Sequence, residues 1–192
     1  FFMNNTEVFI KKTKGPGNLN FILIPNAGGD HHFFKYQINM LKKYGDIIQL
    51  DLPGHGKSPI AKNPNIDSTS RLILDICEKK SLENICLIGL NNGANIAINT
   101  LSLGKNKIKS LILIDPPVFL DKEFIKELRV FINKLDLEST NYKYFIDELV
   151  NNILANSNNE NKIIAKNSFL SADNESLKIM FSSLKIGLVL VM

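Results

Sequence analysis

The sequence lacks the segments that mark membrane and secreted proteins. Among its 192 residues the longest apolar stretches are residues 110–114 and 186–192, far shorter than the roughly 20 residues that cross a bilayer as a helix. Residues 1–7 contain no basic start followed by an apolar core of the kind found in signal peptides. We therefore expect no membrane partner and a cytoplasmic location.

Arginine is nearly absent, because Arg71 and Arg129 are the only two in the sequence. The formal net charge is +4, but the lysines are scattered among acidic residues rather than gathered in one segment. Proteins that read nucleic acids rely on arginine contacts and on a concentrated basic surface. The composition therefore predicts that nucleic acid is not a partner.

Cysteine is equally scarce. Cys77 and Cys86 lie in separate apolar segments and match no metal-binding spacing. Isolated cysteines of this kind are typical of reduced core residues in a cytoplasmic protein. We expect neither a metal nor a cofactor.

Apolar runs and helical patterns alternate from residue 20 to residue 116. Four continuous apolar runs predict buried strands, and the segments between them carry apolar residues at helical spacing. Such alternation is typical of the α/β class, in which a mostly parallel sheet carries helices on both faces. The predicted strands are 21–24, 47–50, 85–88 and 111–114, and the predicted helices are 33–44, one around 72–77, and 93–103.

The pattern changes after the fourth strand. Residues 121–183 contain two amphipathic stripes and further helical segments with no strand between them, which predicts a helical cap over the edge of the sheet. Helices that merely cover a sheet face are the alternative. We therefore divide the chain into an α/β core at 1–120, a cap at 121–183 and a further core strand at 184–192.

Three polar loops follow successive predicted strands, at 25–30, 51–58 and 89–93. Open parallel sheets bind ligands at the carboxyl ends of their strands, so we expect these loops to meet at one edge. In the first loop two glycines let main-chain amides turn toward a ligand, and the N–H of Ala27 is placed to stabilise an oxyanion. Taken alone, each of the first two loops also fits a plain turn.

The third loop has glycines at both ends, Gly89 and Gly93. A sharp turn from strand to helix needs small residues two positions on either side of its apex. The spacing therefore predicts that Asn91 is the apex, raised above the sheet beside the positive end of a helix dipole. A glycine pair at this spacing also occurs by chance, so the prediction depends on all three loops occurring in order.

With these three loops, the sequence resembles the α/β-hydrolase fold family over roughly residues 7–118. Residues 24–29 look like the oxyanion loop of the family, and residues 51–58 closely match its loop after the following strand. Residues 87–97 resemble its nucleophile elbow. The resemblance implies a doubly covered parallel sheet with a helical cap.

The resemblance also implies roles for individual residues. The N–H groups of Ala27 and Asn92 would form the oxyanion hole, and Asn91 occupies the position of the nucleophile. Family members carry Ser there, or less often Asp or Cys, because the reaction needs an atom that attacks carbon. An Asn amide is a poor nucleophile. Asn91 is consistent with a replaced Ser, and equally with a substituted or deamidated Asp nucleophile.

A second departure from the family concerns the general base. The family's histidine follows the last strand of the sheet, whereas all three histidines of this sequence precede the elbow. His31 and His32 adjoin the oxyanion loop and are candidates for substrate contact, while His55 is expected to be structural. Asp115, directly after the fourth strand, is the candidate acid or alternatively an acid that caps a turn. If 184–192 is the strand that follows the cap, the chain is truncated before the family's usual acid and histidine.

These features predict a relative of enzymes that hydrolyse an ester, a thioester or a similar small substrate through an oxyanion intermediate. We expect hydrolysis by this chain to be absent or very weak. One alternative is a catalytically dead ligand-binding or scaffold protein. Another is a relative of dehalogenases or epoxide hydrolases whose nucleophilic Asp is present as Asn. In each case we expect a small-molecule partner, and self-association through the incomplete sheet edge.

Overall fold

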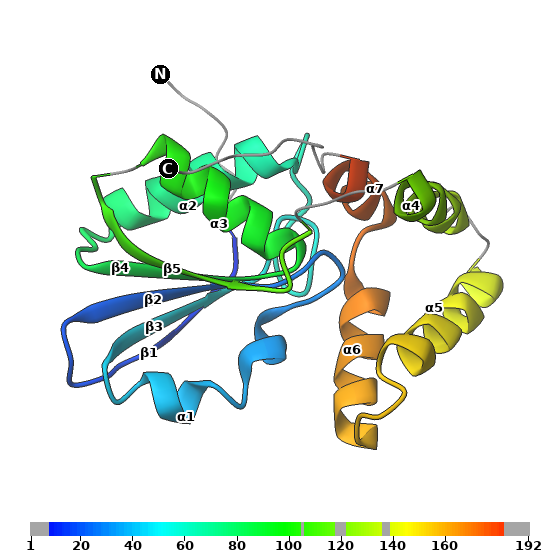
Figure 1. Cartoon of the computed structure of the whole chain (residues 1–192), viewed down its shortest axis with the longest axis horizontal. Coiled ribbons are helices and arrows are strands. Elements are labelled where there is room, and N and C mark those ends of the chain that lie inside the picture. Colours follow the sequence, from blue (N-terminus) through cyan, green and yellow to red (C-terminus); the bar gives the residue numbers. More distant parts are fainter. Residues whose placement is uncertain (1–7, 105, 118–121, 136–138, 183–192) are drawn as a thin grey trace.

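A computed structural model describes residues 8–104, 106–117, 122–135 and 139–182 of the chain. Its centre is a five-stranded sheet with the strand order β1-β3-β2-β4-β5, shown in Figure 1. The strand predicted at 184–192 lies outside the described residues. The strands are β1 (Ile10–Thr13), β2 (Leu19–Ile24), β3 (Gly45–Leu50), β4 (Ile85–Leu90) and β5 (Ile108–Ile114).

Four of the five strands run parallel, and β1 alone pairs with its neighbour β3 in the antiparallel sense. This arrangement confirms the predicted mostly parallel α/β sheet. Strand β1 was not predicted. Its sequence, Ile-Lys-Lys-Thr, is half charged and lies at the edge of the sheet, where only one side needs apolar residues, so it lacks the continuous apolar run of the inner strands.

Helices cover both faces of the sheet, as predicted. Helices α2 (Ile66–Lys79) and α3 (Asn92–Leu103) lie on one face, and the short helix α1 (Ile38–Leu41) lies on the other (Figure 1). Alternate residues of a strand point to opposite faces. Accordingly Ile22 of β2 belongs to the core cluster beneath α2 and α3, whereas Leu23 belongs to the cluster beside α1.

The single helix predicted over 33–44 is wrong. The structure has a 3₁₀ helix, η1 (His31–Phe34), followed by a turn and by α1. The Asp30 side chain accepts the N–H of His32 at 2.8 Å and so begins a tight turn. The next main-chain bonds span three residues, from Lys35 to His32 and from Gln37 to Phe34, and this spacing keeps the segment out of the α-helical ladder until Gln37.

In the described part of the chain, four helices follow β5. They are α4 (Lys122–Lys134), α5 (Ser139–Ile153), α6 (Asn159–Ser171) and α7 (Asn174–Ser182), and they lie to one side of the sheet (Figure 1). Several contacts join them to the core: the Phe169 ring fills the space beside Gly28, and the N–H of Asp173 donates to the carbonyl of Gly54 at 2.7 Å. The Tyr36 hydroxyl also donates to Glu160 of α6 at 2.8 Å. Among the described residues, every helix is too short or too polar to cross a bilayer.

Candidate active site

The turn between β4 and α3 has the sharp geometry that the sequence predicts. Asn91 has φ 50° and ψ −114°, in the region that L residues rarely adopt. A Cβ atom on Gly89 would lie 2.3 Å from the carbonyl oxygen of Gly93, and one on Gly93 would lie 2.3 Å from that of Ile24. Both glycines are therefore needed for the close approach of strand and helix, and Asn91 is the apex.

The side chain of Asn91 is held at both ends of its amide. Its Oδ1 accepts the main-chain N–H of Asn92 at 3.0 Å, and its Nδ2 lies 3.3 Å from Oδ2 and 3.4 Å from the carbonyl oxygen of Asp115. The N–H of Asn92 is the group predicted to stabilise an oxyanion. In this structure Asn91 itself occupies that donor, so a substrate oxygen could reach it only after the amide rotates away.

Asp115 follows β5 directly and has φ 49°. The main-chain N–H of Asn91 donates to the carbonyl of Ile114 at 2.8 Å, which ties the elbow to the end of β5. The candidate acid and the apex residue are therefore side by side, as their positions at neighbouring strand ends predict. The carboxylate of Asp115 contacts an amide rather than an imidazole, and the role of an acid that orients a base stays a prediction.

The oxyanion loop lies against the elbow from the other side. A Cβ atom on Gly93 would lie 2.5 Å from the carbonyl oxygen of Pro25, two residues before the buried Ala27. Gly28 has φ 82°, and the N–H of Gly29 donates to the carbonyl of Asn26, so the segment is a tight turn. The pairing of the Ala27 N–H with that of Asn92 as an oxyanion hole remains a prediction.

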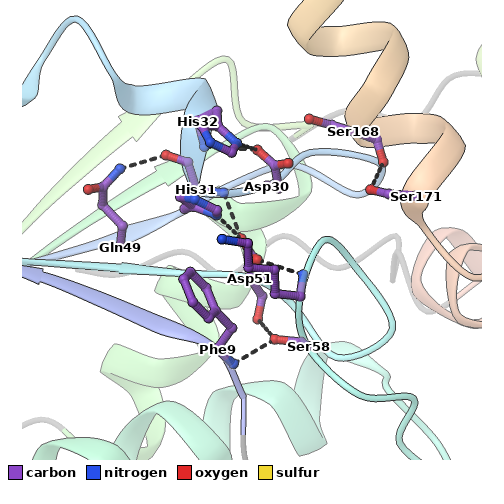
Figure 2. A network of polar contacts seen from close by, with 10 residues as sticks. Phe9, Asp30, His31, His32, Gln49, Asp51, Ser58, Ser168 and Ser171 are labelled. Atoms are coloured by element: carbon purple, nitrogen blue, oxygen red, sulfur yellow. Dashed lines mark hydrogen bonds and ion pairs between the residues drawn. The ribbon is translucent and has the colours of Figure 1, made fainter.

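His31 and His32 are fixed by neighbouring carboxylates, as Figure 2 shows. His31 is 3% exposed, and both its main-chain N–H and its Nδ1 contact Oδ1 of Asp51, at 2.7 and 2.8 Å. The half-exposed His32 contacts Oδ1 of Asp30 through Nδ1 at 3.0 Å. The predicted substrate contacts of both histidines stay predictions, because neither ring is joined to the elbow by a described hydrogen bond.

The importance of Asp51 was not predicted from the sequence. This carboxylate is fully buried and also accepts the N–H of Lys57 at 2.9 Å, while the Ser58 hydroxyl donates to its main-chain carbonyl at 2.7 Å. Asp51 thus joins the loop after β3 to the loop after β2. Its position as the first residue of the glycine-rich loop 51–58 was the available signal.

His55 is structural in its contacts, as predicted. Its ring is buried, and Nδ1 lies 3.0 Å from the carbonyl oxygen of Pro53. Burial lowers the pKa of His55, because a charged ring is poorly solvated there. The ring of His55 is enclosed in its own loop, and no described hydrogen bond joins it to the residue at the elbow.

One group among the described residues has the composition of a metal site. Asp30, His31 and His32 each offer a ligand atom, and these atoms lie within 4.8 Å of one another. However, Asp30 and Asp51 already hold the Nδ1 atoms of the two rings. A metal ion would therefore have to use the Nε2 atoms, with the carboxylates orienting the rings from behind.

One cavity of the described residues lies away from the elbow. It has a volume of about 580 Å³ and lies between the loop that precedes α2 and the first turns of that helix. Asn91 is not among its lining residues, so this cavity is separate from the candidate active site. Its lining includes Pro53, Ala61, Asn63, Pro64, Thr69 and Leu72.

The fold and the elbow together define an α/β-hydrolase. A family model described as the alpha/beta hydrolase fold matches residues 20–162, which is most of the chain. The protein therefore belongs to the α/β-hydrolase fold family, and the resemblance found in the sequence is confirmed.

The chain is similar to an esterase and to a lactonase. The chain is 30% identical over 186 residues to the pimeloyl-[acyl-carrier protein] methyl ester esterase of Wigglesworthia glossinidia brevipalpis, with 93% of this chain and 69% of the relative covered. It is 28% identical over 85 residues to 3-oxoadipate enol-lactonase 1 of Acinetobacter baylyi, with 44% of this chain and 32% of that protein covered.

Solved structures agree on the fold. An esterase from Exiguobacterium antarcticum superposes with a TM-score of 0.82 at 19% identity, covering 93% of this chain and 69% of the esterase. MenH from S. aureus gives a TM-score of 0.74 at 19% identity, covering 91% of this chain and 70% of MenH. At these identities the likeness establishes the architecture alone.

Proposed function

We propose that the protein descends from α/β-hydrolases that cleave small carboxylic esters, and that its own apex residue supports little or no hydrolysis. The observation that carries this proposal is the position of the Asn91 amide. By the resemblance to the family, residue 91 takes the position of the nucleophile, and its amide accepts the N–H of Asn92 at 3.0 Å. The esterase and lactonase names of the relatives support the substrate class.

The chemistry of an amide explains the loss. The nitrogen lone pair of Asn is delocalised into the carbonyl, so the group attacks an ester carbon poorly. The side chain also blocks a donor that would stabilise the developing oxyanion, and losing one such donor costs about 10²- to 10³-fold in rate. Finally, the described hydrogen bonds of His31, His32 and His55 all lead away from Asn91, so no imidazole is in place to accept a proton.

The direct test is hydrolysis of short p-nitrophenyl esters by the unaltered chain and by Asn91→Ala. We expect both to release nitrophenolate at the rate of the buffer background. Saturable turnover that disappears in Asn91→Ala would show that the amide is catalytically competent. Turnover that survives the substitution would place the reaction at another site. Either result contradicts the proposal.

A second variant gives a positive readout. In Asn91→Cys the apex thiol lies at the start of α3, where the helix dipole stabilises a thiolate, and the N–H of Asn92 is free for the oxyanion. We expect a stoichiometric burst of nitrophenolate with an acetyl group on residue 91, detected by mass spectrometry. Asn95→Cys, on the same helix but away from the apex, is the matched control and should show no burst.

The two native cysteines leave this experiment with little background. Both thiols are buried, and burial raises the pKa of Cys77 to about 11, so neither should be acylated at neutral pH. A burst of equal size in Asn95→Cys, or none in Asn91→Cys, would contradict the assignment of residue 91 to an elbow that faces substrate. Saturable binding of an ester without turnover would favour the ligand-binding alternative.

A further inference from the structure

We propose that Asn91 is a self-modifying residue, which loses its side-chain amide by closing a five-membered imide with the main-chain nitrogen of Asn92. The product is a carboxylate at the apex of the elbow. The inference rests on the placement of Asn91 at the apex, and it does not depend on whether the chain hydrolyses esters.

The backbone of Asn91 already has the shape of this ring. Imide closure requires the Cβ of the asparagine and the next main-chain nitrogen to be nearly eclipsed about the Cα–C bond. In an L residue Cβ stands about 120° from the main-chain nitrogen around that bond, so the observed ψ of −114° brings the two almost into one plane. Helical residues, near −42°, and strand residues, near +120°, are far from it.

The attacking nitrogen is available. Asn92 is the first residue of α3, and the first N–H groups of a helix have no partner in the helical ladder. Its N–H donates to Oδ1 of Asn91 at 3.0 Å, which brings the amide next to the nitrogen that would attack it. Ring closure therefore breaks no hydrogen bond of the helix.

Asp115 is placed to help the leaving group. Its Oδ2 lies 3.3 Å from Nδ2 of Asn91, and its exposed position leaves room for water. A carboxyl group at this distance can pass a proton to the departing nitrogen, and water can carry the proton released by Asn92 to that carboxyl group. We assign Asp115 this proton-carrying role.

The bonds balance without any further reagent except water. A bond forms between the main-chain nitrogen of Asn92 and Cγ of Asn91, the bond from Cγ to Nδ2 breaks, and ammonia leaves with the proton from Asn92. Water then opens the imide. Attack at Cγ restores the main chain with an aspartate side chain, whereas attack at the main-chain carbonyl of residue 91 gives an isoaspartyl linkage.

The product changes what the elbow can do. A carboxylate at the apex is the kind of nucleophile that some α/β-hydrolases use in place of serine, because it can attack an alkyl carbon and form a covalent ester. The start of α3 also favours negative charge at this position. The modification would thus convert an inert apex into a nucleophilic one.

The test is deamidation of the native full chain at mildly alkaline pH in ¹⁸O-labelled water, followed by trypsin digestion and tandem mass spectrometry. The peptide between Lys80 and Lys105 carries Asn91 and Asn92, and also Asn95 and Asn99 on α3 as internal controls. We expect a single labelled oxygen at residue 91 and a mass gain of about 3 Da there, against about 1 Da in ordinary water. Asn95 and Asn99 should remain amides.

Deamidation of the unfolded chain shows how much of the rate at Asn91 comes from the folded backbone and how much from the neighbouring residues in the sequence. Asn92 precedes Gly93, and glycine imposes the least steric hindrance on the nitrogen that attacks. In concentrated urea we therefore expect Asn92 to deamidate faster than Asn91. In the native protein we expect the opposite order, with Asn91 deamidating at least about tenfold faster than Asn92. Native Asn91 that stays an amide, or an order that folding leaves unchanged, would overturn the proposal.

Substitution of Asp115 tests its role in proton transfer. Asp115→Asn should slow the native reaction at residue 91 by about tenfold or more, at the low end of what general acid–base groups contribute, while Asp75→Asn on the exposed side of α2 should not. Circular dichroism checks that both variants are folded. Equal rates in Asp115→Asn and the unaltered chain would overturn the role of Asp115. The readout is mass, so a failed ester assay leaves this test intact.

Discussion

At the scale of single residues, the backbone shape of the elbow depends on its glycines, whereas its chemistry depends on the residue at its apex. Gly89 and Gly93 permit the close approach of β4 and α3, and this approach holds residue 91 at a positive φ. Strained backbone of this kind costs about 1–3 kcal/mol and persists only where the surroundings enforce it. The elbow therefore keeps its geometry although the residue at its apex is an amide.

Asp46 is the residue with the clearest electrostatic contribution. Its Oδ2 lies 2.9 Å from Nζ of Lys12 and 3.0 Å from Nζ of Lys14, and its Oδ1 accepts the N–H of Gly15 at 3.1 Å. The hydrogen bond from Lys12, followed by those from Gly15 and Lys14, holds the pKa of Asp46 well below its usual range. The ionised carboxylate thus fastens β1 and the segment after it to β3.

We predict that Asp46→Asn lowers the free energy of unfolding by about 1 kcal/mol at neutral pH, a value typical of partly exposed pairs. A carboxyl whose pKa is depressed on folding contributes stability above its unfolded pKa of about 3.9, and that contribution is lost as the pH falls toward the folded value. Urea unfolding at neutral and acidic pH measures it. The difference in unfolding free energy between Asp46→Asn and the unaltered chain should become smaller in acid. A difference that does not change with pH would show that the charge of Asp46 does not contribute.

The chemistry of the site could be predicted from the sequence only in part. Asn91 and Asp115 were each singled out because each follows a predicted parallel strand, and the carboxyl ends of such strands meet at one edge. The contact of His31 with Asp51 was not predicted, because it joins side chains of two loops that are 20 residues apart. The block of the Asn92 N–H by Asn91 depends on a rotamer, and no sequence pattern specifies a rotamer.

At the scale of secondary structure, the length and the burial of a segment decide whether its apolar pattern predicts a strand or a helix correctly. The three inner strands, β2, β3 and β4, were predicted within a few residues because they are apolar on both faces. The edge strand β1 and the interrupted segment 31–41 were not, since one is half charged and the other is divided by the turn that Asp30 begins. Apolar spacing alone does not distinguish a 3₁₀ turn from the start of an α-helix.

The joint between β4 and α3 should be intolerant of a single methyl group. In Gly93→Ala the new Cβ would lie 2.3 Å from the carbonyl oxygen of Ile24 and 2.5 Å from that of Pro25. Backbone atoms cannot yield as a flexible side chain would, so we expect a loss of about 2–4 kcal/mol in unfolding free energy. Asn95→Ala in the same helix is the control, and denaturant unfolding is the measurement. Equal stability of the two variants would mean that strand and helix are less closely packed than described.

At the scale of the whole molecule, the two sides of the sheet end differently. On one side the antiparallel strand β1 closes the sheet with a charged sequence, as natural edges commonly do. On the other side β5 pairs with β4, and in the described part of the chain no strand pairs with its outer edge. Ile112, Leu113 and Ile114 are 45%, 37% and 40% exposed. An exposed apolar strand edge is a template for a second copy of the chain.

We therefore predict that the protein self-associates through β5, and that Ile112→Lys weakens this association by about tenfold or more because a charge opposes edge-to-edge pairing. Light scattering after size-exclusion chromatography, over a range of concentrations, measures the oligomeric state. Ile60→Lys is the matched control, since Ile60 is 66% exposed and lies on the loop between β3 and α2 rather than on a strand. A monomer at every concentration, or equal weakening by both variants, would show that β5 does not form the interface.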